Sequence, residues 1–246
     1  MENFVRNEQE RVDNLHIKGY QIIQNIDHFR YGTDAVLLSW YVACKVYSKS
    51  HIIDIGTGTG IVPILLAANN VGESIDTLEI QDYYADLARR NIKLNKLDHK
   101  INVFHGDMRF LPEEIIRNKY DAVISNPPYM RESIHNSNKA LAIARHEITW
   151  SMEEFMKSAS RIMKDKGKCI LIHRADRIVD IFYHMRLNHI EPKSMRLIYP
   201  KRGKNANLVL VEGAKNGKPQ LTVEESLIIY GEDGKYTDEL LRIYYG

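Results

Sequence analysis

Glycines recur at every second position in a run that follows a short apolar segment. Asp54 ends the apolar part of segment 51–55, and Gly56, Gly58 and Gly60 come next. Glycines allow backbone conformations that other residues avoid and let the main chain approach a ligand closely. The residues after the run are typical of a helix, whose first N–H groups attract polar or anionic groups. The run therefore predicts a site for a nucleotide-like ligand, although its spacing differs from the Gly-x-Gly-x-x-Gly of dinucleotide-binding proteins.

A second group of residues that could do chemistry is Asn126-Pro127-Pro128-Tyr129, directly after the apolar segment 120–125. Prolines fix the backbone and lack N–H groups, so this turn offers only main-chain acceptors. The Asn126 side-chain oxygen and the Pro127 carbonyl could accept both hydrogens of an –NH2 group and so direct its lone pair. The Tyr129 ring offers a flat face to a planar base or amide. A rigid turn without chemistry is the alternative.

Acidic residues end three successive predicted strands. Asp54, Glu79 and Asp107 lie at the ends of segments 51–55, 74–80 and 100–108. The carboxyl ends of parallel strands meet at the sheet edge where open α/β sheets bind ligands. Glu79 follows Gly60 at the distance typical of an acid that binds ribose hydroxyls. An exposed strand-end carboxylate is the alternative for Glu79.

The elements that would position these residues alternate between strands and helices. A short link between the last two strands makes one of them antiparallel. We therefore predict a single α/β domain, 1–246, in which an N-terminal hairpin and helix (1–50) precede a core (51–246) with a mainly parallel seven-stranded sheet and one antiparallel strand. The predicted strands are 51–55, 74–80, 100–108, 120–125, 168–173, 191–199 and 207–212, and the predicted core helices are 61–69, 82–95, 111–118, 152–163 and 176–187.

Before this core, the sequence predicts a hairpin over residues 15–24 and a helix that ends near residue 47. Thr33 or Asp34 could cap this helix without binding any ligand. Residues 131–149 are polar, and we expect them to form a loop over the site.

Composition and charge narrow the class of protein. The chain has 246 residues, a net charge of +2 and two cysteines without metal-type spacing. It shows no apolar leader and no run long enough to cross a membrane, so we expect a cytoplasmic protein without a metal. Between residues 157 and 218, however, the sequence has 15 Lys and Arg but only 5 Asp and Glu. This local excess indicates a phosphate-rich partner, with a solvated lysine-rich surface as the alternative.

Together the motifs resemble a known class of enzymes. The run from Asp54 to Gly60 resembles the cofactor loop of the Rossmann-like, class I S-adenosyl-L-methionine-dependent methyltransferases. With Asn-Pro-Pro-Tyr downstream, the chain resembles those that methylate the N6 amine of adenine or the glutamine side chain of release factors. Segments 29–38 and 205–213 are similar to those of the tRNA1(Val) adenine-N6 methyltransferases, which act on the adenine beside the anticodon.

The resemblance implies S-adenosyl-L-methionine as cofactor, tRNA as partner, a monomer, and a role for each motif. The target amine and base would be held by Asn126, Pro127, Pro128 and Tyr129. The cofactor would be bound by Tyr31, Gly32, Thr33 and Asp34 at its methionine end, by Asp54, Gly56, Thr57, Gly58 and Gly60 in the glycine run, and by Glu79, Ile80, Asp107 and Met108 around its adenosine. The tRNA backbone would be gripped by Lys193, Arg196, Lys201, Arg202 and Lys204.

Two other functions stay open at this point. A protein glutamine methyltransferase would use the same Asn-Pro-Pro-Tyr acceptors, although such enzymes typically carry a helical N-terminal domain. An RNA-binding protein that retains the fold without activity is the second alternative, and the intact Asp54, glycines, Glu79 and Asn126 argue against it.

Overall fold

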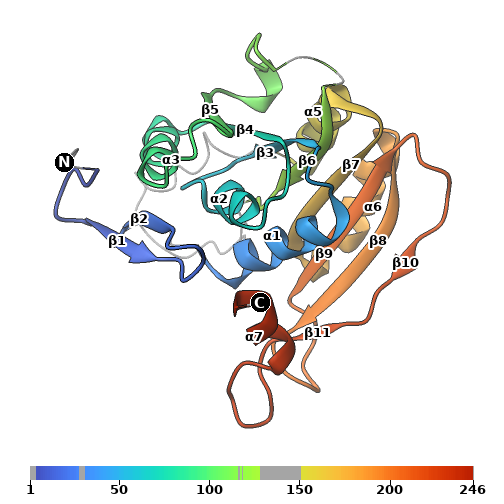
Figure 1. The fold of residues 1–246 in the computed structure, drawn as a ribbon. Helices are drawn as coiled ribbons and strands as arrows, with labels where there is room; N and C mark the ends of the chain where they lie inside the picture. The colour runs from blue at the N-terminus through green and yellow to red at the C-terminus, as the bar shows by residue number, and fades with distance from the viewer. Residues whose placement is uncertain (1–3, 28–30, 116, 118, 128–150, 246) are drawn as a thin grey trace, which may run out of the picture.

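A computed structural model of the chain describes residues 4–27, 31–115, 117, 119–127 and 151–245, and a large twisted sheet organises them (Figure 1). The strand order is β10-β8-β9-β7-β6-β3-β4-β5, and β11 also pairs with β8. The strands are β3 (His51–Ile55), β4 (Ser74–Glu79), β5 (Ile101–His105), β6 (Tyr120–Ser125), β7 (Met163–Arg174), β8 (Ile190–Tyr199), β9 (Leu208–Lys215), β10 (Thr222–Val223) and β11 (Leu227–Ile228).

The pairing confirms the predicted sheet. Within this sheet only β9 runs antiparallel to its neighbours, β7 and β8, and the other pairs of its described strands are parallel. The seven long strands, β3 to β9, are the seven predicted. The two-residue strands β10 and β11 add to the edge at β8 and were not predicted.

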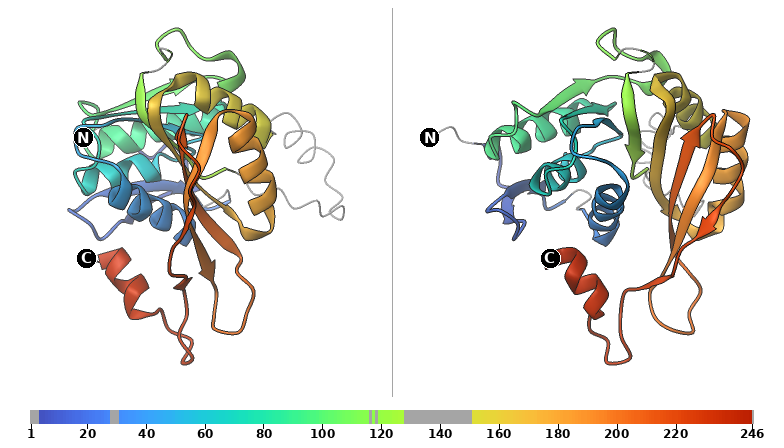
Figure 2. Two further views of the ribbon diagram at one scale, coloured as in Figure 1. Left: turned by 90° about the vertical axis from the view of Figure 1, so that its right-hand side faces the viewer. Right: turned by 45° about the vertical axis from the view of Figure 1, so that its right-hand side comes forward.

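Helices cover both faces of the sheet (Figure 2). Successive side chains of a strand point to opposite faces, so Ile52 packs in one apolar core and Ile53 in the other. The first core lies under α1 (Thr33–Lys45), α2 (Ile61–Ala68), α3 (Asp82–Leu94) and α7 (Asp238–Tyr245). The second lies under α5 (Met152–Ile162) and α6 (Ile178–Leu187), with short 3-10 turns at η1 (Met108–Phe110) and η2 (Ala175–Arg177).

Two predicted elements differ from the structure, and one helix was not predicted. The N-terminal hairpin is present, but its strands are β1 (Glu10–Asn14) and β2 (Gln21–Asn25), so residues 15–20 form the loop. The prediction of a helix over 111–118 is wrong for the residues described there. Leu111 precedes a proline, a position that disfavours helical backbone, and it has ψ 135. The helix α7 was not predicted, and the expected loop at 131–149 lies outside the described residues.

Two asparagines one helical turn apart attach the hairpin to α3. The buried Asn91 side chain accepts from Ile23 N (2.6 Å) and donates to Ile23 O (3.1 Å) and Thr59 O (2.9 Å). The more exposed Asn95 accepts from Gln21 N (2.8 Å) and donates to Gln21 O (2.7 Å). Since Thr59 belongs to the glycine run, Asn91 joins the hairpin to the turn that follows β3.

Replacing Asn91 should test this attachment. Asn91→Ala leaves three buried main-chain groups without partners, and each unsatisfied group costs roughly 1–3 kcal/mol. We expect the free energy of unfolding, measured by urea denaturation, to fall by about 2–4 kcal/mol. Asn95→Ala is the matched control and should lose less than about 1 kcal/mol, because water can replace its bonds. Equal losses from the two variants would contradict the assigned role of Asn91.

Candidate active site

Strand order brings the two predicted motifs together. Parallel β3 pairs with β4 on one side and with β6 on the other, so the glycine run after β3 lies beside Asn126, which follows β6. The Ser125 hydroxyl donates to Ile55 O (2.7 Å) and joins the ends of these two strands. Glu79 ends β4 and Asp107 follows β5 at the same edge. All four features therefore share the carboxyl edge of the sheet, where open α/β sheets bind ligands.

The glycine run forms a turn that only glycine accommodates easily. Gly56, Gly58 and Gly60 have φ of 75°, 57° and 79°, a backbone conformation that other residues rarely adopt. A Cβ added at Gly56 or Gly58 would have no protein atom within 4 Å among the described residues, so the space above the turn is open. The turn can therefore approach a ligand with its main chain.

Glu79 is a structural partner of this turn. One carboxylate oxygen accepts from Gly58 N and the other from Gln81 N, both at 2.9 Å. The side chain is buried, with the residue 4% exposed, which rules out a solvated strand-end carboxylate. Burial raises the pKa of Glu79, and the amides of Gln81 and Gly58 partly oppose that rise. Each carboxylate oxygen can accept more than one hydrogen bond, so Glu79 could also bind ligand hydroxyls.

Asp54 is a buried acid of the site with a raised pKa. It is 1% exposed, and burial, with a smaller contribution from the charge of Glu79, raises the pKa of Asp54 to about 7. The neighbouring Thr57 hydroxyl opposes the shift, but neither Asp54 Oδ2 nor Thr57 Oγ1 has a well-formed hydrogen bond within the described part of the chain. A cationic group of a ligand could supply the missing partner.

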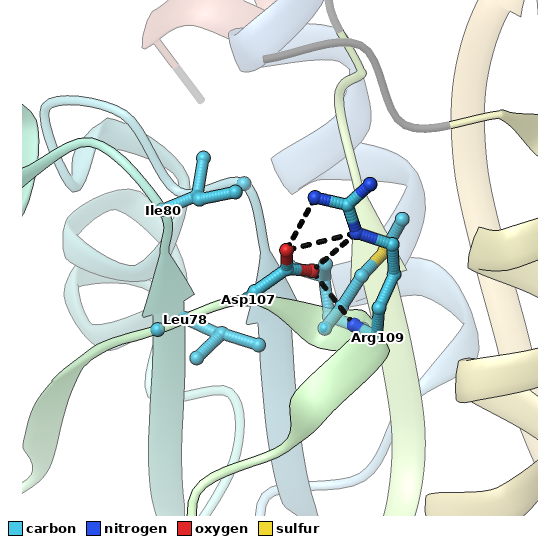
Figure 3. Close-up of a pocket in the computed structure, with 8 residues that line it drawn as sticks. Leu78, Ile80, Asp107 and Arg109 are labelled. Atoms are coloured by element: carbon cyan, nitrogen blue, oxygen red, sulfur yellow. Dashed lines mark hydrogen bonds and ion pairs between the residues drawn. The ribbon is translucent and has the colours of Figure 1, made fainter. Parts of the chain in front are cut away.

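A pocket opens between the ends of β4 and β5 (Figure 3). Leu78 and Ile80 form its apolar side, and Asp107 lies across from them. Arg109 binds both oxygens of Asp107 (2.5–3.0 Å) and lowers the pKa of Asp107. The Met108 carbonyl, also at the pocket, accepts from the Ser158 hydroxyl at 2.8 Å. Apolar walls with one acidic group suit a flat heterocycle that carries an amino group.

Asn126 is held by a residue from the predicted cofactor loop. Its Nδ2 donates to Asp34 Oδ2 at 3.0 Å. An ionised carboxylate only accepts hydrogen bonds, so this contact fixes which end of the Asn126 amide faces Asp34. The amide oxygen is then on the other side, as required for an acceptor that holds an –NH2 group. Pro127 is buried beside it, and the predicted Pro128 and Tyr129 lie outside the described residues.

No side chain caps the start of α1, and the residues there make other contacts. Gly32 is the N-cap, without a side-chain hydrogen bond, so the expectation that Thr33 or Asp34 caps the helix is wrong. The Thr33 hydroxyl instead accepts from Tyr244 Oη of α7 at 3.0 Å. Tyr31 N donates to the Gln24 side chain (3.1 Å), and burial raises the pKa of Tyr31. The predicted role of these residues at the methionine end stays a prediction.

The predicted RNA contacts fall into two groups. Lys201, Arg202 and Lys204 are exposed in the loop between β8 and β9, and Lys193 is half-buried, with Nζ bonded to Lys218 O at 3.1 Å. Arg196 is buried: its guanidinium binds Glu239 (2.5 Å) and lies 5.1 Å from the Trp40 ring centroid. Arg196 therefore anchors α7 and does not present its charge to solvent.

Several residues of the site were not predicted. Arg109 and Leu78 line the pocket, Asn91 supports the glycine turn, and Tyr244 reaches Thr33. Arg109 lies two residues from Asp107, so it acts through a local contact, whereas Asn91 and Tyr244 act through tertiary contacts that leave no local pattern.

Metal sites and membrane-spanning helices are both absent from the described residues. They contain no group of His, Cys, Asp and Glu side chains arranged to hold a metal ion. They also contain no helix with the length and apolar character needed to cross a membrane.

Comparisons with known proteins agree with the geometry. The methyltransferase small domain family matches residues 27–181. A tRNA1(Val) (adenine(37)-N6)-methyltransferase of Porphyromonas gingivalis is 28% identical, with 94% of this chain and 93% of the relative covered. One from Tolumonas auensis is 30% identical, with 92% of each chain covered. The crystal structure of a predicted O-methyltransferase from Agrobacterium tumefaciens shares the fold, with a TM-score of 0.68 and 23% identity, covering 86% of this chain and 95% of that one.

The buried Asp54 should make stability depend on pH. Its pKa is higher in the folded than in the unfolded chain, so the folded state binds more protons between about pH 4 and 7. Stability is therefore lost as pH rises through this window, by up to about 4 kcal/mol. Asp54→Asn should remove that loss, so the free energy of unfolding of the variant should rise relative to that of the parent chain as pH rises. Urea denaturation from about pH 4 to 8 measures this difference.

Asp107→Asn is the matched control, because Arg109 lowers the pKa of Asp107. This carboxylate stabilises the fold above its ordinary pKa and loses that effect only as pH falls below about 4, so the difference between Asp107→Asn and the parent chain should stay constant from about pH 4 to 8. A pH-independent difference for Asp54→Asn would show that Asp54 does not titrate as assigned.

Proposed function

Because the chain belongs to the methyltransferase small domain family, and within it to the tRNA1(Val) (adenine(37)-N6)-methyltransferases, we propose that it methylates the N6 amine of an adenine in tRNA, with S-adenosyl-L-methionine as donor. The observation that supports the proposal is that Asn126 lies beside the open glycine turn, where it would hold a target amine next to the bound donor. The proposed target is the adenine beside the anticodon of a valine tRNA. We also propose that the protein is cytoplasmic, where tRNA is found, and that it acts as a monomer.

The residues present fit the cofactor. The open space above Gly56 and Gly58 and the partnerless oxygen of Asp54 suit its cationic methionine end. Glu79 would bind the ribose hydroxyls, and the pocket at Ile80 and Asp107 would take the adenine. When bound, S-adenosyl-L-methionine supplies a methyl group on a positively charged sulfur that leaves as a neutral thioether.

The protein then acts mainly by alignment. The Asn126 amide oxygen and the Pro127 carbonyl would accept the two hydrogens of the target amine, so that its lone pair points at the methyl group. The bound cofactor would supply the methyl group for the new N–C bond, and the nitrogen, once methylated, would give up its proton to water. No strong base is required before the attack, because the amine becomes acidic only on methylation. Holding two reactants in line can lower a barrier by about 7–11 kcal/mol.

A labelling experiment tests the proposed function. The protein is incubated with methyl-labelled S-adenosyl-L-methionine and either unmodified tRNA or a release factor, and labelled nucleosides are identified by mass analysis. We expect N6-methyladenosine in tRNA, and at least a hundredfold slower transfer by Asn126→Ala with cofactor affinity nearly unchanged. Label in the release factor and none in tRNA would favour the glutamine methyltransferase instead.

The contact between Asp34 and Asn126 makes a second prediction. Asp34→Asn places an amide against Nδ2, so the Asn126 side chain can turn over and present its –NH2 end to the target amine. Asp34→Ala only releases Asn126 and cannot favour the wrong orientation. We expect kcat to fall about 10- to 100-fold for Asp34→Asn and less for Asp34→Ala.

Cofactor binding by both variants should be measured by calorimetry as the control. If Asp34 orients Asn126, the dissociation constant stays within about twofold of the parent value. Loss of cofactor affinity equal to the loss in kcat would instead place Asp34 at the methionine end, as the resemblance implies.

A further inference from the structure

We propose that four tyrosines of the C-terminal segment form a platform on which unpaired bases of the RNA substrate stack. The inference rests on the proposed function, because it assigns a surface to the same substrate. We call Tyr230, Tyr236, Tyr244 and Tyr245 the tyrosine stack. Consecutive ring centroids are 5.3, 5.9 and 6.0 Å apart, and the Tyr236 and Tyr244 rings are inclined by only 16°.

Tyr244 of the tyrosine stack is linked to the acceptor site through Thr33 and Asp34. Tyr244 Oη donates to Thr33 Oγ1 at 3.0 Å. The next residue, Asp34, accepts from Asn126 at 3.0 Å. A chain of direct contacts thus connects the ring stack to the residue that would hold the target amine. A nucleotide next to the target adenine would therefore meet aromatic surface.

The outer end of the tyrosine stack lies against the basic loop. Tyr230 N donates to Pro200 O at 3.0 Å, and Lys201, Arg202 and Lys204 follow Pro200 as exposed residues. Figures 1 and 2 show α7, the turn before it and the loop between β8 and β9 at one end of the molecule. The surface therefore combines aromatic rings with positive charge, the two features that single-stranded nucleic acid requires.

Three rings of the tyrosine stack are exposed, and other contacts anchor α7. Tyr245 is 68% exposed, Tyr236 38% and Tyr230 36%. Other contacts anchor the helix: Leu240 is buried in the core, and Glu239 pairs with the buried Arg196 at 2.5 Å. The exposed ring surface is thus available to a partner with flat apolar groups.

The charges around the stack favour bases over phosphates at the rings. The turn between Tyr230 and Tyr236 contains Glu232 and Asp233, which repel a phosphate backbone. Stacking on an aromatic ring does not need a cation, since every base has a flat face. Phosphates would contact the basic loop, and bases would contact the tyrosine stack.

Aromatic substitution separates stacking from charge. Tyr230→Leu and Tyr245→Leu should each raise the dissociation constant for tRNA by roughly 5- to 100-fold at every salt concentration, because a stacking partner is lost. The slope of affinity against salt should stay unchanged. Lys201→Ala and Lys204→Ala should instead reduce that slope by about one for each lost phosphate contact. Fluorescence anisotropy with labelled tRNA between about 50 and 200 mM salt measures both quantities.

Matched variants complete the test. Tyr230→Phe and Tyr245→Phe keep the ring and should bind like the parent chain. Tyr183→Leu, on α6 and 62% exposed, should have no effect. A second measurement changes the RNA: anticodon stem-loops with single abasic nucleotides should lose affinity for the parent protein at one or two loop positions. The Leu variants should bind these stem-loops and the intact one with the same affinity.

The outcomes separate this inference from the proposed function. If the parent chain methylates tRNA but the Leu variants bind it with parent affinity, the tyrosine stack is not an RNA platform. Equal losses from the Leu and Phe variants would assign the effect to the hydroxyl groups, and they too would overturn the proposal. If the parent chain neither binds nor methylates tRNA, the proposed function itself fails. A complex with another protein that depends on these rings, without any effect on tRNA, would show a protein-binding surface instead.

Discussion

Parallel pairing of β3 with a strand on each side determines where every part of the site lies. The chain leaves β3 toward β4 and β5 and later returns to the opposite side of β3 as β6. Connections that depart in opposite directions leave a crevice beyond the strand ends. The glycine turn occupies that crevice, and Asn126 enters it from β6. The residues predicted to bind the methyl donor and those predicted to hold the target amine are therefore neighbours in the fold. Strand order brings them together, although they lie far apart in the sequence.

The site concentrates groups that are costly to bury. Asp54 and Glu79 are both buried on either side of the glycine turn, and the negative charge of Glu79 disfavours a second negative charge on Asp54. Buried charge without a partner destabilises a fold, so the two apolar cores that flank the sheet must offset it. Two main-chain amides partly compensate the charge of Glu79, whereas Asp54 Oδ2 has no hydrogen-bond partner among the described residues. The structure is thus better matched to a cationic ligand than to an empty turn.

The local patterns predicted most of the sheet, because strands and helices of a parallel α/β fold carry strong periodicity. The seven long strands and the antiparallel position of β9 are confirmed. The helix predicted at 111–118 fails at its first residue, because Leu111 precedes Pro112 and is not helical. The helix α7 was not predicted, although its apolar residues between Leu240 and Tyr244 recur at helical spacing. Among site residues, Glu79 and Asp107 could be placed from strand ends. The contact from Asp34 to Asn126, and the burial of Arg196 under α7, depend on tertiary packing that no local pattern contains.

The Asn91 side chain bonds the backbone of the hairpin and that of the glycine turn simultaneously. Opening either segment alone would leave polar groups of the other without partners inside the protein. The two therefore tend to open together as one cooperative unit. A ligand that closes the turn would then slow amide hydrogen exchange in β2, so exchange in the N-terminal hairpin would report on occupancy of the glycine turn.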